Sequence, residues 1–261
     1  MNYPNFYTIS AAFQSTSGSI ANLVAGVNEM KTTCKDTTLL GSFLENHDNP
    51  RFPSLTSDIS QAKNAIGFHM LFDGIPILYQ GQEQHYSGGN VPANRETIWT
   101  SGYSITAPLY TYIAQLNLIR KWVIVRDSSW LMYQATPVYS DNHTIAIRKG
   151  AIGRQTVSVF SNRGSGGCGS ASLASKATGF SNNMLVTELL TCKISTTDSS
   201  GSLKVTTTNG LPNIFYPTLA LPLGFICIPN LCRRPVPLEV TSALADHRDS
   251  PSTRTSLCDF L

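Results

Sequence analysis

The residues best suited to chemistry lie together in one short polar segment that follows an apolar run. After the run 39–44 come five polar side chains: Asn46, His47, Asp48, Asn49 and Arg51. Pro50 lies among them, and a proline cannot continue a strand ladder. Because ligands bind at the carboxyl ends of strands in parallel sheets and barrels, this position indicates a binding or catalytic site. The alternative is a polar turn that only closes the strand.

Apolar patterns in the first half predict the elements that position this segment. Apolar residues recur at helical spacing over 19–30, 58–72 and 107–122, with Ser17 or Ser19 as the first N-cap. Gly74 can adopt the left-handed C-cap conformation after the second helix. Short apolar runs predict buried strands over 39–44 and 75–79, and the long polar segment 81–106 is typical of a binding loop. This order predicts a parallel α/β part.

The second half changes to short alternating runs separated by turn residues, which predicts an antiparallel β-sandwich. The predicted strands are 130–133, 138–139, 144–148, 156–161, 184–189, 203–207 and 214–216. From about residue 229 the chain is rich in Pro, Ser, Arg and Asp without periodicity, which predicts disorder. We therefore expect an α/β part over 1–126, a β-sandwich over 127–228 and a disordered tail over 229–261.

Composition excludes several classes of function. The chain has 261 residues, 41% of them hydrophobic and 13% charged, with a net charge of +3 and no basic cluster, so we expect no nucleic-acid partner. No apolar window of about 18 residues exists, which argues against a membrane-spanning helix. No H-E-x-x-H, G-x-S-x-G or phosphate-binding glycine motif is present, so metalloprotease, serine hydrolase and nucleotide-enzyme functions lose their basis.

The cysteines leave disulfides and free thiols open. They are widely spaced and form no C-x-x-C, which disfavours a zinc site: Cys34, Cys168, Cys192, Cys227, Cys232 and Cys258. The low charge and the sequon Asn142-His143-Thr144 fit a secreted protein. The start of the sequence carries no signal-peptide pattern, and the two expectations conflict.

Other polar or aromatic residues have weaker claims to a function. Glu83 follows a predicted strand, but a structural role outweighs a role as general acid. His69 on a predicted helix is expected to be packed or at the surface, whereas His85 lies in the predicted binding loop. Isolated aromatic side chains of that loop, such as Trp99 and Tyr103, are more often packed than bound to sugars.

Three segments in a fixed order resemble the C-terminal half of fungal α-amylases of the Taka-amylase type. They are 43–52, with the run Glu45-Asn46-His47-Asp48-Asn49-Pro50-Arg51-Phe52, then 73–86 and 92–96. The resemblance covers roughly 2–227. It implies that 1–126 is the last part of a (β/α)8 TIM barrel, about strands 6–8, followed by the C-terminal β-sandwich of that family.

The resemblance also implies roles for individual residues. Asp48 corresponds to the carboxylate that stabilises the oxocarbenium-like transition state, and His47 and Arg95 correspond to substrate-binding residues. The nucleophile and the general acid of a retaining glycosidase come from earlier strands of the family, outside this chain. The calcium ligands of the intact family also lie upstream, so no metal ligand is assigned.

Some positions depart from the family pattern. Val91 stands where the fungal family ordinarily has an aspartate, which weakens the expected sugar binding through Arg95. Cys192 and Cys227 match the family disulfide of the sandwich. The family partner of Cys34 would lie upstream, so we expect Cys34 to be unpaired.

The sequence thus indicates an α-amylase-family glycoside hydrolase that in its intact form cleaves internal α-1,4 bonds of starch or glycogen with retention. We expect this chain to be a truncated form without activity, monomeric if folded and extracellular by family. A non-catalytic starch-binding or interaction module is the alternative. A coding region assigned incorrectly, with a missing 5′ part and a read-through tail after about Cys227, is the third possibility.

Overall fold

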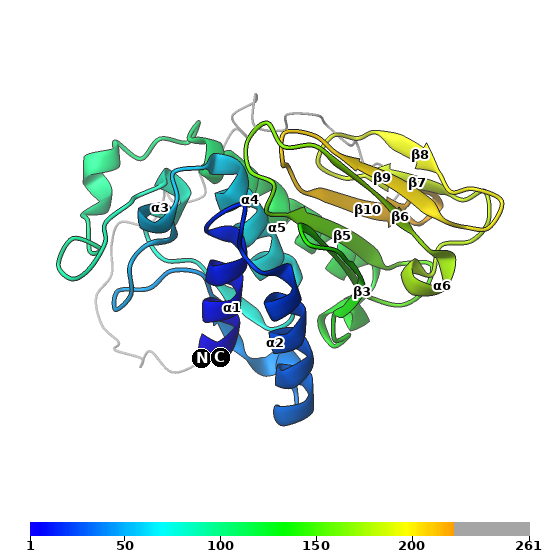
Figure 1. Ribbon diagram of the computed structural model, residues 1–261, viewed down its shortest axis with the longest axis horizontal. Helices are drawn as coiled ribbons and strands as arrows, with labels where there is room; N and C mark the ends of the chain where they lie inside the picture. The colour runs from blue at the N-terminus through cyan, green and yellow to red at the C-terminus, as the bar shows by residue number, and fades with distance from the viewer. Residues whose placement is uncertain (222–261) are drawn as a thin grey trace, which may run out of the picture.

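The computed structural model describes residues 1–221, with the helices of the first half on one side and the strands of the second half on the other (Figure 1). The predicted tail 229–261 lies outside the described residues, as do Cys227, Cys232 and Cys258. The elements are α1 (Tyr3–Phe13), α2 (Ile20–Thr33), η1 (Thr37–Leu39), β1 (Gly41–Phe43), α3 (Phe52–Leu55), α4 (Ile59–Leu71), β2 (Ile75–Ile77), η2 (Gln82–Gln84), η3 (Ile98–Ser101) and α5 (Pro108–Arg126). Strands β1 and β2 pair in parallel, with Phe43 opposite Ile77. The predicted α/β character is confirmed.

The helix starts follow their capping residues. The Ser19 side chain accepts a hydrogen bond from the Asn22 N–H at 3.1 Å, and α2 begins directly after Ser19. Asp58 caps α4 in the same way, accepting from the Ser60 N–H at 2.8 Å. These bonds satisfy backbone donors that lack a partner within the helix. The helices expected at 19–30, 58–72 and 107–122 are therefore confirmed, whereas α1 was not anticipated.

The expected C-cap of α4 is wrong. The C-cap position is Phe72, with an extended backbone, and the left-handed Gly74 (φ +94°) follows two residues later. A Cβ atom on Gly74 would lie 2.2 Å from the carbonyl oxygen of Leu40. Gly74 therefore serves the turn from α4 into β2, where two backbone segments pass closely.

The two predicted strands are shorter than expected, and one is not buried. Leu39 belongs to a 3-10 turn and is 68% exposed, so only Gly41–Phe43 of the first run forms a strand. In β2, Ile75 is 61% exposed and Ile77 38% exposed. Within residues 1–221 this sheet consists of β1 and β2 alone, which leaves β2 with an uncovered edge. The prediction of a buried second strand is therefore wrong.

The second half forms the antiparallel sandwich that the alternating pattern predicts. Six strands pair in the order β3-β4-β5-β10-β7-β8, and β6 pairs with β9 in a second, smaller sheet. The elements are η4 (Ser128–Leu131), β3 (Thr136–Ser140), β4 (Thr144–Lys149), β5 (Thr156–Ser161), β6 (Gly169–Leu173), α6 (Ser175–Thr178), β7 (Leu185–Glu188), β8 (Ile194–Thr196), β9 (Leu203–Thr207), β10 (Asn213–Pro217) and η5 (Thr218–Ala220). Buried side chains fill the space between the sheets, including Val157, Val159, Leu203 and Val205.

The predicted strand at 130–133 is wrong, because this run forms the 3-10 helix η4 and loop residues. Trp130 is fully buried there, and its indole N–H donates to the Thr156 hydroxyl at 3.2 Å. A single anchored aromatic side chain replaces the expected strand pairing. Strands β6 and β8 were not predicted, since Gly169–Leu173 lacks β-branched residues and Ile194–Thr196 is very short.

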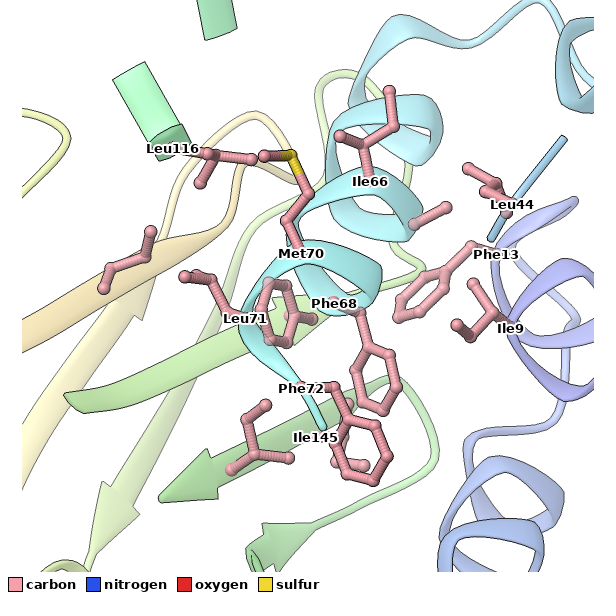
Figure 2. Packing of buried hydrophobic residues seen from close by; sticks show 14 of the residues in the cluster. Ile9, Phe13, Leu44, Ile66, Phe68, Met70, Leu71, Phe72, Leu116 and Ile145 are labelled. Atoms are coloured by element: carbon pink, nitrogen blue, oxygen red, sulfur yellow. The ribbon is translucent and has the colours of Figure 1, made fainter. Parts of the chain in front are cut away.

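Helix α4 lies at the centre of a core that joins the helices to the six-stranded sheet (Figure 2). The Phe68 ring stacks on Phe72 at 5.2 Å and meets the edge of Phe160 of β5 at 5.6 Å between centroids. On the other side it lies 6.3 Å from Phe13 of α1. The hydrophobic core is therefore continuous across residue 126, the expected domain boundary. The boundary itself stays a prediction.

A buried ion pair reinforces this junction. The Lys149 ammonium of β4 lies 2.7 Å from the Asp73 carboxylate, and both side chains are buried. Asp73 also accepts from the Ala135 N–H and from the Thr37 hydroxyl, each at 2.7 Å. Burial lowers the pKa of Lys149, and the charge of Asp73 acts in the opposite direction. The turn after α4 is thus fixed to the sandwich by charge as well as by packing.

No helix within residues 1–221 is long and apolar enough to cross a membrane.

Candidate functional site

Arg51 is the fully buried residue that holds the polar segment after β1 in place. Its Nε donates to the Glu96 carboxylate at 2.6 Å and to the Asn94 carbonyl at 3.1 Å. Its Nη1 donates to the Glu45 carboxylate at 3.1 Å and to the Gln80 carbonyl at 2.9 Å. One guanidinium therefore joins the segment after β1, the segment after β2 and the long loop between β2 and α5.

Aromatic rings and a tight turn complete this anchor. The Arg51 guanidinium lies over the Tyr79 ring, 4.3 Å from its centroid. Glu96 accepts a second bond at 2.6 Å from the Gly88 N–H, and the Gly88 carbonyl accepts from the Arg51 N–H at 3.0 Å. A Cβ atom at Gly88 would lie 1.8 Å from the Ala93 carbonyl oxygen, so only glycine fits there.

Glu45 is the buried carboxylate next to this anchor. Burial raises its pKa to about 7, although the nearby Arg51 guanidinium acts in the opposite direction. Glu45 is 2% exposed and directed at Arg51. Glu45 therefore helps to hold Arg51 in place and is not accessible to a ligand.

A hydrogen-bonded turn presents His47 and Asp48 to solvent. The side-chain oxygen of Asn46 accepts from the backbone N–H groups of Asp48 at 3.0 Å and Asn49 at 2.9 Å. From the long loop, the Asn94 amide donates to the carbonyls of His47 at 3.1 Å and Asn49 at 2.9 Å. The backbone is thus fixed on both sides. The side chains of His47 and Asp48 remain 62% and 56% exposed.

Asp48, His47 and Arg95 form one exposed cluster. His47 Nε2 lies 3.3 Å from an Asp48 carboxylate oxygen, and Arg95 Nη2 lies 3.7 Å from the same oxygen. Arg95 Nε also donates to the His47 carbonyl at 3.0 Å. The arrangement is an exposed carboxylate flanked by two nitrogen donors at the carboxyl end of β1. Such a group can accept hydrogen bonds from hydroxyls and stabilise a nearby positive charge.

His69 supports the strand that leads to this cluster. It is buried on α4, and its Nε2 lies 2.9 Å from the Ser42 carbonyl oxygen of β1. Burial lowers the pKa of His69 to about 4, so the ring is neutral at pH 7. The expectation of a packed or surface histidine is resolved in favour of packing.

The remaining candidate residues take no part in the cluster's contacts. Glu83 and His85 lie in and after η2, where His85 has a positive φ of 61° and its pKa is lowered by burial. Val91 is half-exposed, so this position presents an apolar side chain next to Pro92. Trp99 and Tyr103 are mostly exposed and do not pack in the loop as expected.

The sequence also supports expectations for the cysteines, and it assigns no metal ligand. In the described part of the chain, Cys34 and Cys168 carry free thiols, which agrees with the expectation for Cys34. Cys192 takes part in a disulfide, but Cys227 lies outside the described residues and the pairing stays a prediction. Among residues 1–221 no three His, Cys, Asp or Glu side chains lie together as metal ligands would.

Arg51 belongs to the polar segment singled out from the sequence, but its anchoring role and that of Asn94 were not predicted. Arg51 and Asn94 act through partners from separate segments, and no local pattern reveals a side chain with distant acceptors. The residue type itself could have indicated the role of Arg51. A buried arginine needs several hydrogen-bond acceptors, so an arginine in a motif at the end of a buried strand is expected to contact several segments.

Comparison with protein families supports the resemblance over most of the chain. Residues 1–121 match the family model "Alpha amylase, catalytic domain", and residues 137–230 match "Alpha-amylase, domain C". Together the two matches include the cluster around Asp48 and the β-sandwich.

Individual proteins agree with this assignment. The chain is 52% identical over 227 residues to alpha-amylase 1 of Lipomyces kononenkoae, covering 87% of this chain and 36% of that protein. It is 42% identical over 226 residues to alpha-amylase 2 of Schwanniomyces occidentalis, covering 87% and 44%. The solved structure of an alpha-amylase from Malbranchea cinnamomea is 42% identical, with a TM-score of 0.82 and coverage of 87% and 47%. The chain therefore spans less than half the length of these relatives.

Proposed function

Because the chain belongs to the α-amylase family, with part of the catalytic domain followed by domain C, we propose that it serves the endo-hydrolysis of α-1,4-glucosidic bonds. The substrate class is starch, glycogen and their malto-oligosaccharides, and the anomeric configuration is retained. One observation carries the proposal: Asp48 stands exposed at the carboxyl end of β1, held next to His47 and Arg95.

Asp48 acts on the sugar whose glycosidic bond breaks. Positive charge develops on that ring in the oxocarbenium-like transition state, and a fixed carboxylate lowers its energy. The Asn46 and Asn94 bonds hold the backbone of Asp48, so little reorganisation accompanies the reaction. Hydrogen bonds from sugar hydroxyls to this carboxylate contribute most when they tighten in the transition state.

His47 and Arg95 bind substrate around this carboxylate. The half-exposed His47 ring offers a hydrogen bond to a sugar hydroxyl, and the Arg95 guanidinium contributes donors beside it. Val91 offers no carboxylate near this loop, so Arg95 acts there with fewer polar neighbours than in the fungal enzymes that the sequence resembles.

The polypeptide of 261 residues does not hydrolyse starch by itself. A retaining glycosidase needs a nucleophile and a general acid about 5–5.5 Å apart, and the resemblance gives Asp48 neither role. The buried Glu45 and the partly buried Glu96 are both paired with Arg51. In the described part of the chain, these pairs leave Asp48 as the exposed carboxylate of the cluster.

A reducing-sugar assay on soluble starch tests this proposal. The polypeptide alone should give no turnover above that of its His47→Ala/Asp48→Asn double variant. Co-expression with the preceding part of the Lipomyces relative should produce activity that the double variant lacks. Turnover by the polypeptide alone would contradict the claim of inactivity, and no activity after stable association would contradict the proposed function.

A non-catalytic glucan-binding module is the second candidate, and the closed core of the sandwich favours it. Val157, Val205 and their neighbours fill the space between the two sheets without help from the helices. A pull-down on insoluble starch separates the candidates. Retention that survives Asp48→Asn supports a binding module, whereas loss of retention in that variant supports the catalytic-site assignment.

An extracellular location is part of the proposal. Asn142 of the sequon is exposed in the turn between β3 and β4, where an oligosaccharide can be attached without disturbing the core. Secretion from a fungal host should give a product whose mass falls after enzymatic deglycosylation, and Asn142→Gln should abolish that fall. A secreted product with an unmodified Asn142 would remove this support.

Calcium and oligomeric state complete the proposal. In intact members of the family the calcium ligands lie upstream of the matched region, and this chain is a monomer when folded. Chelation should leave the melting temperature of the 261-residue polypeptide unchanged. A fall in that temperature would reveal ligands within this chain.

A further inference from the structure

A pocket of about 480 Å³ opens between the two sheets of the sandwich, on the side that faces α4 and α5. Helix residues Lys63 and Gln115 form one wall, Lys193 and Ser195 another, and Lys204 and Thr206 of β9 a third. The pocket shares no lining residue with the cluster around Asp48. Its function is therefore independent of the hydrolytic site.

The pocket is positively charged. Three lysines line it, and Glu188 is its single acidic lining residue. Glu188 is buried, and both its oxygens are engaged: one accepts from the Leu190 and Ile214 N–H groups at 3.2 and 2.9 Å, the other from the Thr191 N–H and hydroxyl at 2.7 and 2.5 Å. These bonds direct the carboxylate into the backbone. The lysines therefore lack an acidic partner within the pocket.

The ammonium groups have no ion pairs in residues 1–221, where every ion pair involves other residues. The Lys63 ammonium lies 5.7 Å from the Tyr112 ring centroid, at the helix wall of the pocket. Burial lowers the pKa of Lys63, which means that its charge is partly removed from water without a counter-ion. A partly desolvated cation without a partner gains stability when an anion binds beside it.

Hydrogen-bonding groups surround these charges. In the described part of the chain, the hydroxyls of Ser195, Thr206 and Thr208 make no hydrogen bond within the protein, although all three line the pocket. The side-chain oxygen of Asn213, also a lining residue, is buried without a partner, whereas the unpartnered Tyr112 hydroxyl lies in the core beside Gly67 and Phe160. The Asn213 oxygen can only accept a hydrogen bond, so ordered water or a sugar hydroxyl, and not a phosphate oxygen, can satisfy it.

We propose that this pocket binds a phosphate group, either free or esterified to a sugar. A phosphate is a compact oxyanion with several strong acceptors, which matches the partly buried Lys63, the exposed Lys193 and Lys204 and the hydroxyl groups on the lining residues. A neutral sugar would leave the three positive charges without a counter-ion. A nucleic acid would require a longer basic stripe than these three lysines provide.

The hollow next to the pocket has room for the sugar of a phosphate ester. It has a volume of about 380 Å³, shares Lys204 with the pocket, and is lined by small polar side chains such as Ser170 and Ser172 and by the carboxylate of Asp198. Hydroxyl-bearing side chains can exchange hydrogen bonds with sugar hydroxyls. A phosphorylated sugar could therefore place its phosphate between the lysines and its ring in this hollow.

Isothermal titration calorimetry on the full 261-residue chain tests the proposal with inorganic phosphate, glucose 6-phosphate and glucose at low ionic strength. We expect millimolar or tighter binding of at least one phosphate compound and none of glucose. Equal affinity for the two phosphate compounds identifies free phosphate as the ligand group. Tenfold tighter binding of glucose 6-phosphate identifies the ester.

Charge-matched variants show whether the lysines are responsible. Lys63→Gln/Lys193→Gln/Lys204→Gln should weaken binding at least tenfold. Lys35→Gln/Lys121→Gln/Lys176→Gln, which removes the same charge from exposed positions outside the pocket, should change it less than twofold. Melting curves establish that both variants are folded. Absence of phosphate binding to the folded wild-type chain, or equal weakening in both variants, would overturn the proposal.

Discussion

The buried His69 predicts how the stability of the fold depends on pH. Its pKa is about 4 in the folded chain, against an ordinary value near 6.5, because the ring is removed from water below β1. Between these pH values the unfolded chain binds more protons than the folded chain, so the free energy of unfolding must rise with pH. The contribution is fully present above pH 6.5 and is lost as pH falls towards 4.

The magnitude follows from the size of the shift. A difference of about 2.5 pH units at about 1.4 kcal/mol per unit corresponds to about 3 kcal/mol. In His69→Gln the side-chain amide can still donate to the Ser42 carbonyl, but it does not titrate. The variant should therefore lack this part of the acid sensitivity, even if its stability at pH 7 is lower.

Urea unfolding followed by tryptophan fluorescence between pH 4 and 7.5 measures the effect, since the buried Trp130 reports on the core. The gap between wild type and His69→Gln should shrink by about 3 kcal/mol from pH 7 to pH 4. His143→Gln, in the turn before β4, measures the effect of losing a histidine as such. If the free energy of unfolding changed with pH by the same amount in wild type and His69→Gln, the reasoning would be refuted.

Three further predictions concern the anchors of the site and of the core. Arg51→Lys should lower the free energy of unfolding by about 1–3 kcal/mol, because an ammonium cannot reach four acceptors; an unchanged urea midpoint would contradict the role of the guanidinium. Gly88→Ala should lower the melting temperature by several degrees through the clash with Ala93, and a wild-type temperature would show that the loop adapts. Lys149→Met should cost about 3–5 kcal/mol because it leaves the Asp73 carboxylate buried and unpaired. Adding Asp73→Asn to Lys149→Met should restore part of the lost free energy of unfolding. If the double variant lost the sum of the two single losses, the coupling between the two side chains would be contradicted.

Regular periodicity and turn chemistry made the larger elements predictable. The caps Ser19 and Asp58 lie directly before α2 and α4, and strands 156–161 and 203–207 are predicted with their observed bounds. In these segments the local pattern and the tertiary packing favour the same structure. Helix α1 and strand β6 were missed because their sequences are weakly patterned and depend on partners from other parts of the chain.

The burial of short apolar runs was harder to predict. The apolar run predicts that Ile75 is a core residue, but Ile75 is exposed. Within the described residues β2 pairs only with β1, so its other edge has no neighbouring strand. A strand reveals its own propensity, whereas its burial depends on what covers it. The same limit applies to Trp130. The apolar run around it suggests a strand, but the Trp130 side chain is buried in the hydrophobic core.

The exposed members of the site were accessible from sequence, and their supports were not. Asp48, His47 and Arg95 were found through motif residues and lie together. The guanidinium of Arg51 connects segments up to 45 positions apart. Its partners depend on the fold, which no local spacing in the sequence specifies.

The central claim is that Asp48 stabilises the transition state of glycoside hydrolysis. A chimera tests it directly: the full chain of 261 residues joined to the preceding part of the Lipomyces relative, with kcat measured on soluble starch. Asp48→Asn should lower kcat by about 10²–10³-fold or more with little change in melting temperature, whereas Glu29→Gln, on an exposed part of α2, should keep the activity of the parent chimera. An Asp48→Asn chimera that retains the kcat of its parent would contradict the account.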